Sequence, residues 1–403
     1  MKLGTRITLA IIAVMLIPPI VGLQKAIDPA RKQFQPGRGV GSVMTDMGNN
    51  PVVLPSQFVA GTVIGLQEVV AGLLCVRTDE FFHSGNYEAI IPMVRMITWL
   101  DPHMVDVYSV GAWHLDYNFV DSGQRADHRY VVPAIKFLEE GIANNPSIFD
   151  LYFDLAFVHY YLKIGNFEKA EEYMRLAAKH NPPFYVYREI AHALEKQGRV
   201  DDAIKQWQEC IKIGQEELAR NPKDTGAVTH IQVSKRNMDS TLIRKVERAN
   251  LGSRPTDMGF DANFKRLGPR QFLISGKINV PDGARVFLTL TDSDYKEPTL
   301  KNFSWDVDTD ATALWETQIH GISINKGKFH KKYDLSKDIK QYPFKKDKYT
   351  LTLWFDPRCA PISAQDITGW KGEGITDKQY LDTSIPGVKM VKKVITLNRQ
   401  DIL

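Results

Sequence analysis

The spacing of apolar positions along the chain changes near residue 270. Between residues 52 and 250, apolar residues recur every three or four positions, which is the period of an amphipathic helix. After residue 270 they alternate with polar residues over short runs, which is typical of strands with one buried face. We therefore predict a helical domain over 52–250, a linker over 251–270 that is rich in Gly, Pro, Arg and Asp, and a β-rich domain over 271–403.

The helical part contains a recurring phrase in which a glycine stands five positions before a small or apolar residue. The glycines are Gly85, Gly165 and Gly198, and each separates two stretches with helical spacing. A glycine can adopt the left-handed conformation that ends one helix and lets the next begin. The phrase therefore predicts helical hairpins that repeat along the chain.

The repeats keep a common register. Equivalent positions are separated by 44, 36 and 33 residues, and the longest interval contains an insertion around residues 121–129. These positions are Ile90, Ala134, Ala170 and Ala203. Prolines that cannot continue a helix close three of the units, at Pro102, Pro146 and Pro182. Four units in register predict a solenoid in which neighbouring hairpins bury one another's apolar faces, with residues 224–250 forming a capping helix pair or one long helix.

The spacing resembles the tetratricopeptide repeat, a pair of helices in about 34 residues. Residues 58–62, 77–80, 97–102 and 112–118 also resemble a group of uncharacterised bacterial tetratricopeptide proteins that begin with a membrane anchor and carry a related phrase, AWxxAYN. The resemblance implies an all-α solenoid and a membrane topology, and it brings no activity with it. This chain has Asp116 where that phrase has a small residue.

In such repeats the first helix of each unit lines a concave face. Carrying the register across the units predicts a partner-binding surface of aromatic and charged side chains, which suits the capture of a protein or peptide segment. These residues are Asp79, Phe82, Trp113, Asp116, Tyr117, His159, Lys163, Arg188, His192 and Glu195. The alternative is that they only pack the inner surface or contact a neighbouring domain. His159 and His192 occupy equivalent places, but no acidic or cysteine ligand at tight spacing accompanies them, so we expect no metal.

The amino terminus carries an uncharged apolar run over residues 7–23, preceded by Lys2 and Arg6. Its length is at the short end for a membrane span, and it lacks a small-residue cleavage site. We therefore predict an uncleaved signal anchor in residues 1–24 and a flexible tether in residues 25–51. The short basic start favours a single-pass protein with its bulk outside the cytoplasm, although the basic residues after the run favour the opposite orientation.

In the β-rich part, Pro281, Asp282 and Gly283 form a turn signal between two alternating runs. Later strands are predicted at 314–319, 328–333, 349–355 and 391–397. This pattern predicts an antiparallel β-sandwich of immunoglobulin-like or transthyretin-like type. Residues 348–357 (KYTLTLWFDP) resemble bacterial cell-surface β-sandwich modules, and that resemblance carries no catalytic residues. The acidic run at 306–310 lacks the glycine and glutamate that a calcium loop of the EF-hand type needs, because Ala311 and Thr317 stand there.

Composition narrows the possible functions. A net charge of +4 over 403 residues gives no reason to expect nucleic acid. The three cysteines, Cys75, Cys210 and Cys359, show neither metal-ligand spacing nor a disulfide framework. The chain contains no GxSxG, HExxH, P-loop or ribose-binding GxGxxG motif. We therefore expect no enzyme activity, no cofactor and no catalytic residue.

The leading hypothesis is a membrane-tethered scaffold or adaptor that binds a protein partner in a cell-envelope complex. One alternative is that the β-domain binds a glycan or another surface component through aromatic residues such as Trp305, Trp315 and Trp370. Another is a non-catalytic accessory subunit of a membrane enzyme.

Overall fold

The structure is a computed structural model, and it describes residues 66–83, 89–118, 128–251, 255–305, 307–308, 310–316, 321–339 and 341–403. The predicted anchor (1–24) and tether (25–51) lie outside the described residues. None of the described helices is both long and apolar enough to cross a membrane. The chain divides into two compact units, one ending at Gly111 and including residues 303–306, the other comprising the remainder. Each unit is described by itself.

The first unit contains α4 (Gln67–His83), α5 (Ile90–Leu100) and most of α6 (Val105–Trp113). Buried residues three and four positions apart, such as Val70 and Leu74 on α4 and Val94 and Ile97 on α5, give each helix one apolar face. A short segment from the β-rich part of the sequence also belongs here, because the guanidinium carbon of Arg95 lies 4.2 Å from the ring centroid of Trp305.

The helices of the second unit form the hairpins that the glycine phrase predicted. Gly165 separates α8 and η4 from α9 with a φ of 74°, and Gly198 separates α10 from α11 with a φ of 67°. Both hinges are therefore confirmed, whereas Gly85 lies outside the described residues. The bounds are α8 (Phe149–Asp154), η4 (Leu155–Ile164), α9 (Phe167–Ala177), α10 (Phe184–Lys196) and α11 (Val200–Arg220).

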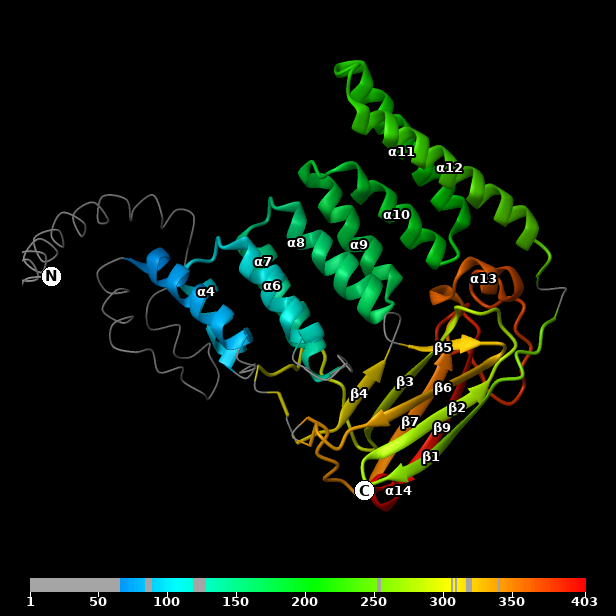
Figure 1. Cartoon of the computed structure of the whole chain (residues 1–403). Helices are drawn as coiled ribbons and strands as arrows, with labels where there is room; N and C mark the ends of the chain where they lie inside the picture. Colours follow the sequence, from blue (N-terminus) through cyan, green and yellow to red (C-terminus); the bar gives the residue numbers. More distant parts are fainter. Residues whose placement is uncertain are drawn as a thin grey trace, which may run out of the picture. The chain divides into compact units, whose positions relative to one another are not determined.

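Further helices of this unit stand before, between and after these, and Figure 1 shows α7 to α12 in chain order. They are η2 (His114–Asn118), η3 (His128–Tyr130), α7 (Val131–Asn144), η5 (Ala178–His180) and α12 (Thr225–Arg248). The predicted cap is one long helix, α12, and the side chain of Asp224 caps its first turn by accepting a hydrogen bond from the amide of Ala227. The repeat register is confirmed by Ala134, Ala170 and Ala203, which are all fully buried.

Within the described residues, nine strands form one antiparallel sheet in the order β1-β2-β6-β5-β3-β7-β9-β8, with β4 paired to β3. Their bounds are β1 (Asp261–Gly268), β2 (Gln271–Lys277), β3 (Arg285–Asp292), β4 (Ala313–Glu316), β5 (Ile322–Asn325), β6 (Lys328–Asp334), β7 (Lys348–Phe355), β8 (Leu381–Asp382) and β9 (Met390–Asn398). Three short helices complete the described part of the domain, η7 (Pro357–Cys359), α13 (Ile362–Thr368) and α14 (Arg399–Ile402).

The antiparallel β-domain is confirmed, but its strands are not divided into the two separate layers of the predicted sandwich. The start of β3 pairs with β5, Arg285 with Ser323 and Val286 with Ile322, while the rest of β3 pairs with β4 and β7. This short connection joins two halves into one half-barrel around a shared core. The alternation of apolar and polar residues along a strand shows which residues face inward. It does not show which strands are hydrogen-bonded to one another, so it could not distinguish a half-barrel from a sandwich.

Two observations bear on the predicted domain organisation. The predicted linker, 251–270, contains strand β1, which pairs with β2 along most of its length. Its composition is polar because β1 is an edge strand with few buried positions. In addition, the hairpins and the half-barrel belong to the same compact unit instead of forming separate domains.

Candidate functional site

The hairpins are joined to the half-barrel by Arg129, which precedes α7. Its Nη1 donates hydrogen bonds to the backbone carbonyl oxygens of Asp308 (3.2 Å) and Ala311 (2.8 Å), and its Nη2 donates to that of Gln341 (3.1 Å). The Arg129 residue is buried. One planar guanidinium therefore holds two loops of the β-domain against the helices.

His128 contributes to the same junction. Its Nε2 lies 2.9 Å from the carboxylate of Glu297, and its ring centroid lies 3.7 Å from that of Trp315. Trp315 is only 7% exposed. This aromatic residue, proposed from the sequence as a glycan contact, is thus engaged inside the protein.

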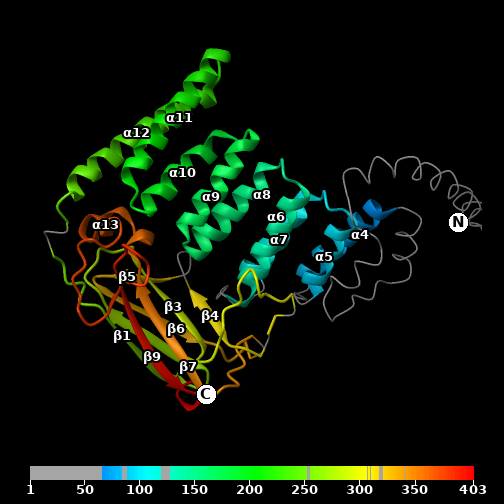
Figure 2. The ribbon, with the colours of Figure 1, turned by 180° about the vertical axis from the view of Figure 1, so that it is seen from behind.

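A second junction lies at the end of α12. The guanidinium carbon of Arg248 is 4.3 Å from the ring centroid of Trp370, and that of Arg244 is 5.3 Å from the same centroid. Arg248 Nε also donates to Asp366 on α13 at 3.1 Å. Both views of the ribbon show α13 beside α12 (Figures 1 and 2). Trp370 is buried by these contacts, so it too is unavailable to a glycan.

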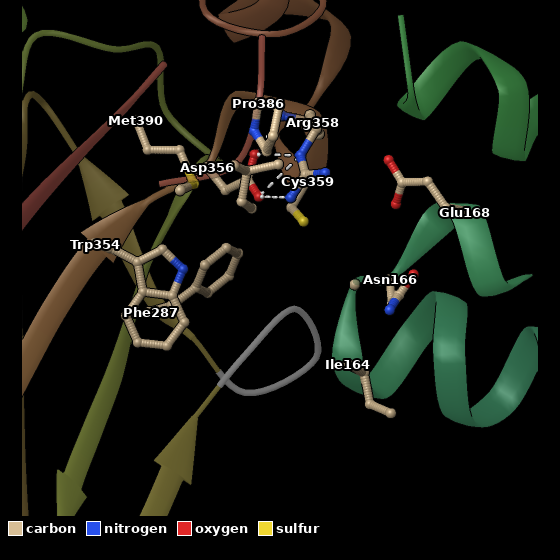
Figure 3. Close-up of a pocket in the computed structure, with 12 residues that line it drawn as sticks. Ile164, Asn166, Glu168, Phe287, Trp354, Asp356, Arg358, Cys359, Pro386 and Met390 are labelled. Carbon is tan, nitrogen blue, oxygen red and sulfur yellow. Dashed lines mark hydrogen bonds and ion pairs between the residues drawn. The ribbon is translucent and has the colours of Figure 1, made fainter. Parts of the chain in front are cut away.

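A cavity of about 610 Å³ lies between the hairpin turn at 164–168 and one end of the half-barrel. Figure 3 shows its two walls, with the hairpin turn on one side and the ends of β3 and β7 on the other. The lining residues are Ile164, Gly165, Asn166, Glu168, Phe287, Trp354, Asp356, Arg358, Cys359, Ile385, Pro386 and Met390.

The sheet wall of the cavity is mostly apolar. Phe287 and Trp354 are direct cross-strand partners on β3 and β7, and their ring centroids lie 5.7 Å apart. Met390, at the start of β9, and Pro386 extend this surface (Figure 3). Trp354 falls on the face of β7 opposite to the core residues Leu353 and Phe355.

The polar part of the sheet wall is a buried ion pair. Arg358 donates from Nη2 to Oδ2 of Asp356 at 2.8 Å and from Nε to both carboxylate oxygens at 3.2 Å. Oδ1 of Asp356 also accepts the backbone N–H of Arg358. Burial opposes the charge, but these bonds raise the pKa of Arg358 above its usual value, so its guanidinium stays charged.

Cys359 and Glu168 complete the polar lining. Burial, followed by the nearby Asp356 carboxylate, raises the pKa of the Cys359 thiol well above its usual value, so it remains a protonated thiol near neutral pH. Glu168 is exposed in the first turn of α9, where a negative charge is favoured by the helix dipole. The adjacent Lys169 pairs with Glu172 at 2.7 Å, and the described residues give Glu168 no ion pair.

Four residues of the predicted concave face come together in the helical interior. Nδ1 of His159 lies 2.6 Å from Oδ2 of Asp116, and Lys163 Nζ donates to the backbone oxygen of Asp116 at 2.6 Å. The hydroxyl of Tyr117 donates to the backbone oxygen of Val158 at 2.9 Å. Asp116 and His159 are 2% and 1% exposed. These side chains join successive helices and do not present a surface, which matches the alternative that they pack the inner side.

Glu195 and His192 form a similar group on α10. The carboxylate of Glu195 accepts hydrogen bonds from Trp207 Nε1 at 3.1 Å, from the hydroxyl of Thr241 and from Arg244 at 3.2 Å. His192 Nδ1 lies 3.9 Å from the same carboxylate. Glu195 therefore ties α10 to α11 and α12.

The remaining predicted residues lie elsewhere, and none of the ten lines the cavity. Arg188 is half-buried beside His230, and Trp113 is 40% exposed at the end of α6. Asp79 is exposed and Phe82 half-buried on α4 in the first unit. The described residues contain no group of three or more His, Cys, Asp or Glu that could hold a metal ion.

No protein-family model matches this chain, and no curated protein matches it. Among solved structures, the chain is similar to TTC0263, described as a thermophilic TPR protein in Thermus thermophilus, with 18% identity and a TM-score of 0.27; the match covers 47% of this chain and 96% of that one. It is also similar to MamA MSR-1 C2, with 22% identity and a TM-score of 0.25, covering 43% and 89%. The helical repeat itself rests on the hairpins described above.

The sequence analysis did not predict the cavity, although one residue pattern in the sequence indicated it. Residues 348–357 alternate so that Tyr349, Leu351, Leu353 and Phe355 face the core. Trp354 is a large aromatic residue on the opposite, more polar face. In the structure this residue lines the cavity, so its place on the polar face of a predicted strand was the available signal.

Proposed function

We propose that this chain is a non-enzymatic protein-interaction scaffold that binds a segment of a partner protein in the cavity between the hairpins and the half-barrel. The observation that carries the proposal is the cavity itself, whose size falls in the usual range of ligand sites. Its two walls come from elements held together by Arg129 and Arg248, so the site is formed before a partner arrives.

The chemistry of the lining supports binding over catalysis. Arg358 and Asp356 are fully engaged with each other, which leaves neither as a general acid or base. The raised pKa of Cys359 leaves too little thiolate for a nucleophile at neutral pH. A mostly apolar wall with a few fixed polar groups is the usual composition of a recognition site.

Membrane tethering is part of this proposal. Residues 7–23 are long and apolar enough to anchor the chain at the short end of the membrane range, and they lie outside the described residues. We propose that the anchor keeps the cavity on the outer side of the cytoplasmic membrane. Alkaline phosphatase fused after Leu403 should then be active, and green fluorescent protein fused there should be dark. The reverse pattern would place the bulk in the cytoplasm.

Site-specific photo-crosslinking tests the cavity as the binding site. Pro386 is an exposed lining residue, so p-benzoylphenylalanine at this position of the full chain should yield a discrete crosslinked protein in the native cell. The product should disappear when Trp354→Ala is added. The matched control carries the photo-reactive residue at Ile362, which is exposed but does not line the cavity. Identical products from positions 386 and 362 would contradict the proposal.

The glycan-binding alternative keeps one of its three aromatic residues, because Trp315 and Trp370 are buried by His128 and Arg248, whereas Trp305 is half-buried. An accessory role in a membrane enzyme is a special case of the scaffold. Enzyme activity that co-purifies with the full chain, and is lost with Trp354→Ala, would identify it.

A further inference from the structure

The charges that line the cavity do not cancel. Among its described lining residues, the ionised side chains are Asp356, Arg358 and Glu168. Asp356 receives three side-chain hydrogen bonds from Arg358, so these two charges neutralise each other at close range. Glu168 remains, and its carboxylate gives the cavity a net negative charge.

The position of Glu168 directs this charge toward a ligand. Figure 3 shows its side chain leaving the first turn of α9 on the side that faces Arg358 and Cys359. The guanidinium of Arg358 interacts electrostatically with this carboxylate. Because Asp356 already holds Arg358, Glu168 can accept a cation from a bound molecule without breaking an existing ion pair.

The opposite wall of the cavity favours an apolar group in the ligand. Trp354 is half-buried and offers the main apolar surface of this wall, whereas Phe287 and Met390 are 3% and 5% exposed and support it from behind. Aromatic ring faces, the indole face above all, also attract cations, so this wall tolerates a positive charge nearby.

Resting on the proposed function, we propose that the cavity binds a partner segment in which a large apolar side chain stands next to lysine or arginine. The apolar side chain packs against Phe287 and Trp354, and the cation pairs with Glu168. An acidic segment brings a second carboxylate toward Glu168. The volume of about 610 Å³ accommodates two side chains of this size.

A random hexapeptide phage library, panned against the purified full chain, tests this directly. The expected result is enrichment of an aromatic or large aliphatic residue beside lysine or arginine. Two capped, fluorescein-labelled peptides are then compared. One has the enriched sequence, and the other has the same sequence with its basic residue replaced by glutamate. Fluorescence anisotropy measures the affinity of each. The basic peptide should bind about threefold to tenfold more tightly, the effect of gaining a partly exposed ion pair and avoiding a like-charge contact.

A charge reversal with a matched control isolates Glu168. Glu168→Lys should invert the order of the two peptides. Glu172→Lys makes the same change of charge one turn further along α9, at an exposed residue that does not line the cavity, and should leave the order intact. Equal or tighter binding of the acidic peptide by the unmodified chain would overturn the inference.

A variant that fills the cavity distinguishes failure of the preference for a basic segment from failure of the proposed function. Pro386→Trp places a large ring at an exposed lining position and should abolish binding of the enriched peptide. If the variant abolishes binding but charge has no influence on affinity, only the preference for a basic segment fails. If Pro386→Trp binds the peptide unchanged, or if the library yields no enrichment, the cavity is not the binding site and the proposed function fails as well.

Discussion

His159 Nδ1 lies 2.6 Å from Asp116 Oδ2, although the two residues are 43 positions apart and both side chains are almost completely buried. The second carboxylate oxygen of Asp116 has no hydrogen-bond partner among the described residues. A buried pair of this kind tolerates the loss of one member poorly, because the other is left without its hydrogen-bond partner and away from water.

We therefore expect Asp116→Ala to lower the free energy of unfolding by about 1–3 kcal/mol, since it leaves the buried His159 without its hydrogen-bond partner. Urea unfolding followed by circular dichroism measures the change. Glu172→Ala, which breaks the exposed pair with Lys169, is the control and should cost less than about 1 kcal/mol. A similar small loss for both variants would show that the buried pair contributes little to folding.

Stability should fall in mildly acidic solution because of His230. Its ring is buried against Phe184, and burial followed by the charge of Arg188 lowers its pKa to about 4 from 6.5. Since the unfolded chain takes up this proton first, stability is lost as the pH falls from about 6.5 to about 4, by on the order of 3 kcal/mol in total. Denaturant unfolding at pH 7.5, 5.5 and 4.5 should show a shallower pH dependence for His230→Gln. His330→Gln, at an exposed position, should retain the full slope.

Arg129→Lys should loosen the junction between the hairpins and the half-barrel. A lysine ammonium cannot reproduce the planar fork that reaches three carbonyl oxygens, so at least one buried acceptor is left unpaired. We expect a loss of about 2–4 kcal/mol in unfolding free energy. Faster amide hydrogen exchange around Ala311 and Gln341 should accompany it. Arg236→Lys, exposed on α12, should change neither quantity.

Gly276 lies where β1 meets β2 and has no room for a side chain. An added Cβ would stand 2.2 Å from the backbone oxygen of Asp261 and 2.3 Å from the ring of Phe329. We expect Gly276→Ala to destabilise the protein by about 1–3 kcal/mol, because strand or ring must move. At Gly268 the nearest atom would be 3.9 Å away, so Gly268→Ala should leave the melting temperature nearly unchanged. Equal melting temperatures for the two variants would show that β1 shifts to accommodate the added methyl group without a loss of stability.

Local signals explain what the sequence predicted correctly. Gly165 and Gly198 were recognised because a left-handed hinge requires glycine, and the alanines of the repeat register because close helix contacts require small residues. Strand β1 was missed because an edge strand buries few residues, so its polar composition resembles a linker.

The candidate site could not be derived in the same way, because it is assembled from distant segments. Its walls are formed by residues 164–168, 287, 354–359 and 385–390, and only the pairing of β3 with β7 and the docking of the helices bring them together. The partner-binding role of the predicted inner face stays a prediction, but the helical offsets used to assign it need revision. Residues 114–118 and 155–164 are π-helical, and the extra residue in each such turn shifts side chains away from the face that α-helical offsets assign.

The two junctions formed by Arg129 and Arg248 also bear on how such a protein can change over evolutionary time. Recombination within residues 251–270 would be expected to exchange domains freely if the linker joined independent modules. Here, joining these helices to a foreign β-domain would leave the guanidinium of Arg129 without its three carbonyl acceptors. It would also leave the guanidinium of Arg248 without Asp366 and Trp370. The hairpins and the half-barrel are therefore expected to be inherited as one piece, with substitutions on either side of each junction occurring in step.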